Sequence, residues 1–356
     1  MSTKINKISF KGQVLYIGMD VHLKTWHITI LTRDLYLKHF SQEADAGRLI
    51  IYLKEKYPGA TYKCVYEAGY TGFWLAERLN SEGIECMVVN AADIPTTNKQ
   101  QNKKTDKTDS KRLAELLRSG LLNGIYIPKV EDLEDRSLLR TRAMLVRQQA
   151  AMKNRIKAFL GFYGIAITDE QAGKHWSKRY MNYLWAIRLS KQSGQQSLES
   201  LLQVVDFSRE QILQLTKKIR ELSQTDKYSG KVNQLITIPG IGVISAMVIL
   251  TEVMDIKRFN NVNRFRGYVG LIPKEHSSGS KENKSEITRR SNKQLKTTLV
   301  ESSWTAVRTE PSMTLAFELL SARMKKSRAI IRIARKISNR ILHILNTGEE
   351  YVFGVA

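Results

Sequence analysis

The sequence predicts an α/β domain at the N-terminus, a helical middle region and a mainly α C-terminal domain. Three observations support this fold class. Short runs of β-branched and aromatic residues, separated by polar breaks, fill the beginning of the chain. Apolar residues then recur at every seventh position, and the last third is typical of helices separated by glycine turns. We therefore expect three domains, at residues 1–128, 129–230 and 231–356.

The charge balance indicates a polyanionic partner. The chain has 356 residues with 57 Lys and Arg against 34 Asp and Glu, a net charge of +23. An excess of this size favours nucleic acid. No run reaches the roughly 18 apolar residues that span a bilayer, and residues 1–12 lack the apolar segment of a signal peptide. We expect no membrane partner, a cytoplasmic, nucleoid-associated location, and reduced, buried thiols at Cys64 and Cys86.

The N-terminal elements predict an α/β domain of the ribonuclease H type. The expected order is three antiparallel strands, then helix, strand, helix, strand, helix. The expected strands are residues 14–20, 26–31, 35–40, 61–67 and 84–89, and the expected helices are residues 44–57, 73–79 and a segment from 106 onward.

Four carboxylates stand at the ends of these elements. Asp20 ends the first strand and Glu67 ends the fourth, whereas Asp106 and Asp109 share one face of the first turn of the last helix. Taken singly, each acid is also consistent with a helix cap or a solvated strand end. Together they form a set of hard oxygen ligands for Mg²⁺ or Mn²⁺. Two such ions can clamp the attacking and leaving oxygens of a phosphodiester.

The middle region has the apolar spacing of a coiled coil. Seven-residue spacing appears in two rows: Leu138, Leu145, Met152 and Phe159, and later Leu198, Val205, Ile212 and Ile219. A companion row of apolar residues, offset by three positions from the later row and interrupted at Ser208, completes an apolar seam. The seam can close within one chain or between two protomers, and we expect a dimerisation region.

A glycine turn opens the C-terminal domain. Ile238–Gly242 has the sequence IPGIG and precedes an apolar helix, as in a helix-hairpin-helix motif. In such a motif, backbone N–H groups around Gly240 and Gly242 contact a DNA phosphate. The alternative interpretation is a tight turn between two buried helices.

A serine- and glycine-containing segment, His276–Ser280, precedes a basic run. On spacing alone, a flexible surface loop with solvated charges is the simpler interpretation. In the alternative, a serine hydroxyl lies against a phosphodiester that basic side chains hold. The basic residues that we expect to contact nucleic acid are Lys103, Lys104, Lys281, Lys284, Arg289 and Arg290.

Together, these motifs resemble those of the insertion-sequence-110 transposases, also called bridge-RNA-guided recombinases. The N-terminal half resembles the DEDD, RuvC-like domain of that family through Ile17–His22, Tyr66–Gly72 and Lys104–Lys111. The C-terminal part resembles its serine transposase domain through Ile238–Gly242, Gly270–Pro273 and Ser278–Gly279. The resemblance covers about residues 14–120 and 233–345, with a coiled-coil insertion between them.

The resemblance implies an RNA-guided DNA recombinase. In this family the four acids, here Asp20, Glu67, Asp106 and Asp109, bind divalent metal, and the serine at the position of Ser278 forms a covalent link to a cleaved DNA strand. Domains from different protomers build each composite site, which implies a homodimer that assembles into a homotetramer. A bridge RNA pairs with donor and target double-stranded DNA, so the protein recognises mainly the backbone and the shape of the nucleic acid.

Two features separate this chain from the family pattern, and two other functions remain open. Ser291-Asn292 stands where the family often has Gly-Asn, and hydroxyls at Ser277 and Ser280 flank Ser278, so the choice of Ser278 depends on the family pattern.

A metal-dependent nuclease resembling Holliday-junction resolvases would use water as nucleophile and need only the acids. A basic coiled-coil protein that holds RNA or DNA would cleave nothing.

Overall fold

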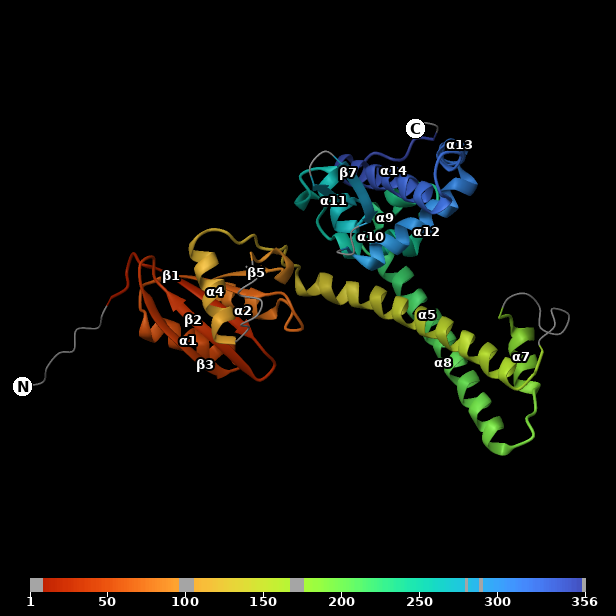
Figure 1. Ribbon diagram of the computed structural model, residues 1–356, viewed down its shortest axis with the longest axis horizontal. Helices are drawn as coiled ribbons and strands as arrows, with labels where there is room; N and C mark the ends of the chain where they lie inside the picture. The colour runs from red at the N-terminus through yellow and green to blue at the C-terminus, as the bar shows by residue number, and fades with distance from the viewer. Residues whose placement is uncertain (1–8, 96–105, 167–175, 279–280, 288–290, 354–356) are drawn as a thin grey trace, which may run out of the picture. The chain divides into compact units, whose positions relative to one another are not determined.

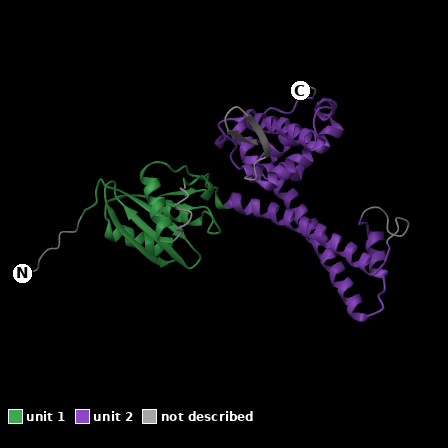
Figure 2. Ribbon diagram, viewed as in Figure 1, with its two compact units in different colours: residues 1–130 green, residues 131–356 purple. Residues whose placement is uncertain are grey.

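The chain folds into two compact units. The computed structural model describes residues 9–95, 106–166, 176–278, 281–287 and 291–353, and within residues 273–287 it describes the backbone alone. The units are Met1–Val130 and Glu131–Ala356, drawn in different colours in Figure 2. No helix in these described ranges combines the length and the apolar character needed to cross a membrane.

Unit 1 is built on a five-stranded mixed sheet with strand order β3-β2-β1-β4-β5 (Figure 1). An antiparallel meander of β1, β2 and β3 is extended by β4 and β5, which run parallel to β1. The strands are β1 (Val14–Val21), β2 (Thr25–Leu31), β3 (Tyr36–Glu43), β4 (Thr61–Glu67) and β5 (Glu85–Val89). The helices are α1 (Ala46–Lys56), α2 (Trp74–Ser81), the short η1 (Ala91–Asp93) and α4 (Asp106–Arg118). The mixed α/β order is the one that the sequence predicted.

Different helices pack on the two faces of this sheet. Apolar side chains alternate along β1 and are fully buried against α1 and α2: Leu15, Ile17 and Met19. The alternate positions, Gly18 and Asp20, belong to the opposite face, where α4 packs. The polar end of β1 is therefore placed beneath α4 rather than in the main core.

Cys64 and Cys86 are neighbours on the parallel strands β4 and β5. Both thiols are free and buried. Burial raises the pKa of each thiol, which favours the neutral form near neutral pH. The predicted burial of both thiols is confirmed.

Helix α4 packs directly on β1 because Gly18 has no side chain. A Cβ atom at Gly18 would lie 2.0 Å from the carbonyl oxygen of Ser110 and 2.4 Å from the backbone nitrogen of Ala114. Thr29 pairs with Gly18 across the β1–β2 ladder, and its hydroxyl oxygen lies 2.9 Å from that of Ser110 in a fully buried contact. These two contacts place the first turn of α4 beside Asp20.

Gly18→Ala is expected to destabilise unit 1. The added methyl group meets helix backbone, which cannot rotate away as a side chain can, and overpacking of this kind costs about 1–3 kcal/mol. Denaturant unfolding of the full chain measures the loss. Gly161→Ala is the control, because a Cβ atom at Gly161 of the long helix described below meets nothing within 4 Å. The close contact between α4 and β1 is refuted if both variants unfold at the wild-type midpoint.

Two long helices, α5 (Val130–Phe162) and α8 (Gln192–Ser223), belong to unit 2. Arg142 Nε donates a hydrogen bond to Thr216 Oγ1 between them, at 2.7 Å. Together with α7 (Lys178–Ala186), they enclose a small apolar cluster that includes Ile156, Leu160, Tyr180, Leu184, Leu198, Leu202 and Val205. Part of the predicted seam is thus buried within one chain.

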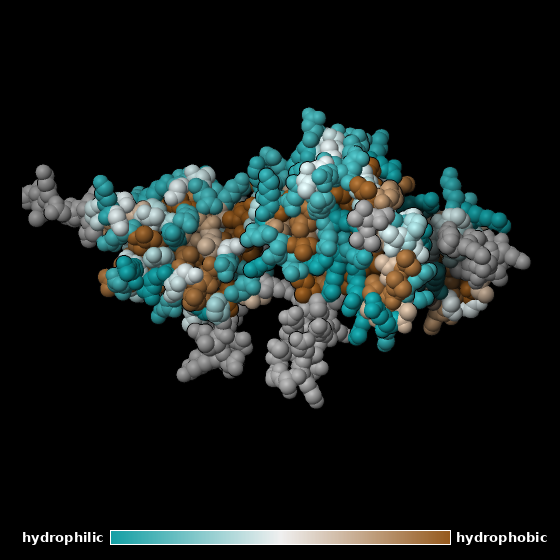
Figure 3. Space-filling view, turned by 90° about the horizontal axis from the view of Figure 1, so that it is seen from above, coloured by the Kyte–Doolittle hydropathy of each residue, from teal (hydrophilic) through white to brown (hydrophobic). Residues whose placement is uncertain are grey.

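Other apolar side chains on α5 and α8 are exposed. Phe162 is 84% exposed, Phe207 is 61% exposed and Leu213 is 63% exposed. Figure 3 shows hydrophobic residues interrupting a largely hydrophilic surface on one face of the molecule. A coiled coil between two protomers would cover such residues, and this pairing stays a prediction.

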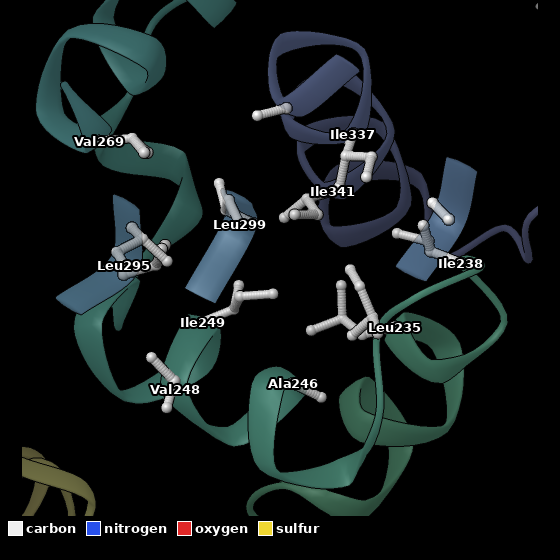
Figure 4. Packing of buried hydrophobic residues seen from close by; sticks show 14 of the residues in the cluster. Leu235, Ile238, Ala246, Val248, Ile249, Val269, Leu295, Leu299, Ile337 and Ile341 are labelled. Carbon is white, nitrogen blue, oxygen red and sulfur yellow. The ribbon is translucent and has the colours of Figure 1, made fainter. Parts of the chain in front are cut away.

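The C-terminal helices surround one apolar core. They are α9 (Ser229–Ile236), α10 (Val243–Val253), η2 (Ile256–Arg258), α11 (Val262–Val269), α12 (Lys293–Thr309), α13 (Pro311–Ser321) and α14 (Lys326–Thr347). Figure 4 shows Ile249 of α10, Leu299 of α12 and Ile341 of α14 directed into this core, where all three are fully buried. The region is mainly α, as predicted.

A β-hairpin stands where the sequence suggested a serine–glycine loop. Strand β6 (Pro273–Ser278) pairs antiparallel with β7 (Lys281–Ile287), and Ser278 is opposite Lys281. Both strands are almost entirely polar and charged. For residues 276–278 the loop interpretation was wrong, since they belong to β6, whereas residues 279–280 lie outside the described residues. Such strands escape sequence analysis because period-two alternation is recognisable only where one face of a strand is apolar.

Candidate metal and nucleophile sites

Asp20, His22 and Asp106 form a cluster beside the end of β1. One ligand atom from each side chain lies within 4.8 Å of the others. His22 Nε2 is 3.3 Å from Asp20 Oδ2 and 3.9 Å from Asp106 Oδ1. Asp20 is partly buried, whereas His22 and Asp106 are exposed. The cluster is therefore open to a ligand from solvent.

His27 supports the cluster from β2. It pairs directly with Asp20 across the β1–β2 ladder, so the two side chains share one face of the sheet. His27 Nε2 lies 3.2 Å from Asp106 Oδ2, and its ring stacks on that of His39 with centroids 6.0 Å apart. An outer partner of this kind orients a metal-binding carboxylate.

Sequence reasoning missed both His22 and His27. His22 stands two residues after Asp20 and was quoted only as part of the surrounding motif, although a histidine so close to an acid is itself a signal for a metal ligand. His27 could not be found by spacing, because its link to Asp20 exists only in the register of the β1–β2 ladder.

The surroundings of Asp20 disfavour its ionised form. Burial raises the pKa of the Asp20 carboxyl group, His22 lowers it, and the nearby Asp106 and Asp109 raise it, so the net pKa is above its ordinary value. A divalent cation relieves such repulsion. Two carboxylates suit Mg²⁺ or Mn²⁺, and an imidazole is compatible with a transition ion, so the donor set fits.

Two of the four predicted acids lie outside this ligand group. Asp109 follows Asp106 on α4 and is near enough to raise the pKa of Asp20. Glu67 ends β4 level with Asp20, because Met19 pairs with Tyr66 one residue earlier, and its side chain is exposed. The structure therefore brings Asp20, Asp106 and Asp109 near one another, and Glu67 is not among the grouped ligand residues.

Ser278 lies in unit 2, whereas the acids lie in unit 1. The hairpin register pairs Ser278 with the basic residue Lys281 and Ser277 with the acidic residue Glu282. Lys284 is also in β7, opposite Glu275. The other basic residues predicted to bind nucleic acid lie outside the described residues: Lys103, Lys104, Arg289 and Arg290.

The IPGIG turn connects α9 to α10 and borders a pocket of about 420 Å³. Gly240 has a φ of 85°, and a Cβ atom there would lie 2.1 Å from the carbonyl oxygen of Ser302 on α12. Close packing against α12 is therefore enough to require this glycine. Gly242 precedes α10 without a side-chain cap, and Thr305 and Thr309 also line the pocket. A phosphate contact at this turn stays a prediction.

Comparison with known proteins identifies the family. Residues 17–165 match a family profile described as a DEDD transposase of the IS110 type, and residues 232–318 match one described as the transposase IS116/IS110/IS902 family. The chain is 30% identical over 256 residues to the transposase for insertion sequence element IS1533 of Leptospira borgpetersenii, which covers 69% of this chain and 72% of that protein. The chain belongs to the IS110 transposase family.

Two further relatives extend this comparison. Over 325 residues the transposase is 28% identical to protein y4qE of Sinorhizobium fredii, with 83% of this chain and 78% of that protein covered. Over 262 residues it is 26% identical to the transposase for insertion sequence element IS1111A of Coxiella burnetii, with 71% and 70% covered. Membership of this family implies DNA cleavage and transfer, and its DEDD domain indicates use of a divalent metal. The acid cluster lies in the first matched region and the Ser278 hairpin in the second.

Proposed function

We propose that this insertion-sequence transposase cleaves and rejoins DNA through a covalent bond to Ser278, assisted by the acid cluster of unit 1. The observation that carries the proposal is the position of Ser278. It ends β6, opposite Lys281, within the region that matches the transposase family. A lysine at the register position paired with the serine is a source of positive charge for a phosphate under attack.

The proposed step is an exchange of one phosphate ester for another. The Ser278 hydroxyl oxygen forms a bond to the scissile phosphorus and loses its proton, while the bond from phosphorus to one deoxyribose oxygen breaks and that oxygen takes up a proton. The strand is then held as a phosphoserine ester. Attack by a deoxyribose hydroxyl of the partner strand reverses these changes, so rejoining needs no other energy source.

Asp20, His22 and Asp106 are the residues that would hold the divalent cation, with Asp109 near Asp20 and Glu67 at the end of the neighbouring strand β4. When bound, such an ion supplies Lewis-acid stabilisation of phosphate charge. His27 keeps Asp106 in place. The proposal includes a composite site in which these residues and Ser278 come from different protomers of a dimer or tetramer.

The proposal also includes guidance by a bridge RNA that pairs with donor and target DNA. The net charge of +23 supports a nucleic-acid ligand of large contact area. Base pairing would then supply sequence specificity, and basic residues would contact the phosphate backbone.

The test uses full-length protein co-purified with RNA transcribed from its own element, with end-labelled donor and target DNA and Mg²⁺. We expect labelled DNA to migrate with the protein on a denaturing gel. Ribonuclease treatment of the protein–RNA complex before DNA is added should abolish this band. Cleaved DNA without protein-linked label would make water the nucleophile and support the resolvase-like nuclease. Binding without any strand scission, in Mg²⁺ or Mn²⁺, would support a protein that only holds nucleic acid.

A further inference from the structure

Glu252 is a fully buried carboxylate in the last turn of α10. It accepts two hydrogen bonds from Arg140, at 2.7 Å from Nε and 2.8 Å from Nη2. A third comes from Asn292 Nδ2, at 2.7 Å. Burial alone raises the pKa of this carboxyl group, but these donors outweigh burial and hold the pKa below its ordinary value. Glu252 is therefore a buried anion with three strong donors.

The partners of Glu252 lie at both ends of the β6–β7 hairpin. Tyr268 precedes β6 by five residues and Asn292 follows β7 by five. The Tyr268 hydroxyl group donates to the backbone carbonyl of Glu252 at 2.8 Å, and Asn292 Nδ2 is 3.1 Å from the same hydroxyl oxygen. The Asn292 backbone nitrogen also donates to the Tyr268 carbonyl at 3.0 Å. Tyr268 and Asn292 are thus joined to each other and to Glu252, Asn292 through the carboxylate and Tyr268 through the backbone carbonyl.

A close backbone approach accompanies these bonds. Gly270, between Tyr268 and β6, has a φ of 84°, and a Cβ atom there would lie 2.0 Å from Cβ of Ser291. The glycine therefore lets the two segments that flank the hairpin meet directly beneath it. Asn292 at the same time caps α12, because its Oδ1 accepts from the Leu295 backbone nitrogen at 3.1 Å.

Arg140, the third partner of Glu252, connects the residues at the ends of the hairpin to α5. Arg140 lies on α5, 112 residues before Glu252 in sequence, and its side chain is half exposed. Removal of Arg140 or Asn292 would leave a buried charge short of donors, which is costly. The arrangement thus links Asn292, beside the hairpin, to α5 through Glu252 and Arg140.

We propose that Glu252 is a positioning residue for the hairpin that carries Ser278, acting through Asn292 and Tyr268 and coupling the hairpin to α5 through Arg140. This inference rests on the proposed function only in so far as Ser278 is the nucleophile. The placement of the hairpin itself is open to measurement without DNA.

The main test is Asn292→Ser in the full-length protein. Serine keeps the cap of α12 but lacks the amide that donates to Glu252. Loss of a hydrogen bond to a charged group should speed amide exchange in β6 and β7 by about tenfold, as followed by hydrogen–deuterium exchange. The rate of covalent DNA capture should fall, while the affinity for DNA stays unchanged. Glu252→Gln, which keeps the size of the side chain, should produce the same two changes.

The matched control is Asn261→Ser. Asn261 caps α11 by accepting from the Arg264 backbone nitrogen at 3.0 Å, in a cap outside the Glu252 group. We expect wild-type exchange in the hairpin and wild-type capture from this variant. Wild-type hairpin exchange in Asn292→Ser would overturn the inference, and so would faster exchange spread through α10, α12 and α14, which would indicate a general stabilising role.

The two proposals fail in different ways. If the wild type shows no capture that depends on Ser278, the proposed nucleophile is wrong, and hairpin exchange in Asn292→Ser still decides whether Glu252 holds the hairpin. If capture depends on Ser278 but both hairpin exchange and capture are normal in Asn292→Ser, the positioning role is wrong and the nucleophile stands.

Discussion

Ser278→Ala is expected to abolish covalent capture of DNA, lowering the yield of protein-linked label by about a thousandfold or more, because removal of a nucleophile removes the bond-forming atom itself. Binding of RNA and DNA should be unchanged, since the hydroxyl group contributes little to a contact dominated by phosphate charge. The measurement is the denaturing-gel assay, followed by mass spectrometry of the peptide that carries the nucleotide.

The neighbouring serine provides the control. Ser277 pairs with Glu282 whereas Ser278 pairs with Lys281, so of these two serines Ser278 is the one paired with a basic residue. Ser277→Ala should therefore capture DNA at close to the wild-type level. Normal capture by Ser278→Ala, or a nucleotide mapped to Ser277, would refute the choice of nucleophile.

Asp20→Asn is expected to lower strand cleavage by about a hundredfold or more, since an ion that stabilises phosphate charge contributes several kcal/mol to the transition state. In chelator at neutral pH the variant should be at least as stable as the wild type. The reason is that the ionised form of Asp20 is disfavoured in the folded chain by burial and by the nearby Asp106 and Asp109. Addition of Mg²⁺ or Mn²⁺ should then raise the unfolding temperature of the wild type and not of the variant.

The contribution of Asp20 to the stability of the metal-free protein should fall as pH rises. Because the pKa of Asp20 is higher in the folded protein than in the unfolded chain, its contribution to stability is fully present below the unfolded pKa and is lost as pH rises through the folded pKa. In the metal-free wild type this loss should be visible by thermal unfolding, and Asp20→Asn should remove it. Asp34→Asn, at an exposed acid between β2 and β3, is the control. A metal-induced rise that persists in Asp20→Asn would exclude Asp20 as a ligand.

Local pattern alone predicted much of this protein. Strand and helix order in unit 1 follows from apolar runs and polar breaks, because secondary structure responds to neighbours within a few residues. Asp20 and Asp106 were found for the same reason, since each stands at a recognisable end of an element. The strongly basic charge and the family motifs are likewise properties of the chain itself.

Tertiary structure decided which of these residues meet. His27 joins the cluster through the β1–β2 register, and α4 reaches Asp20 because Gly18 and Thr29 admit it onto the sheet. Glu67, by contrast, stays outside the ligand group although it ends its strand as predicted.

The hairpin and the residues that hold its two ends show most clearly which features the sequence predicts and which only tertiary packing decides. Ser278 could be chosen from a motif, but the polar strands around it carry no apolar period, so their pairing was invisible in the sequence. Glu252 receives its donors from positions 112 residues before it and 40 residues after it. No local pattern relates such positions, because only the packing of α5, α10 and α12 brings them to one buried carboxylate.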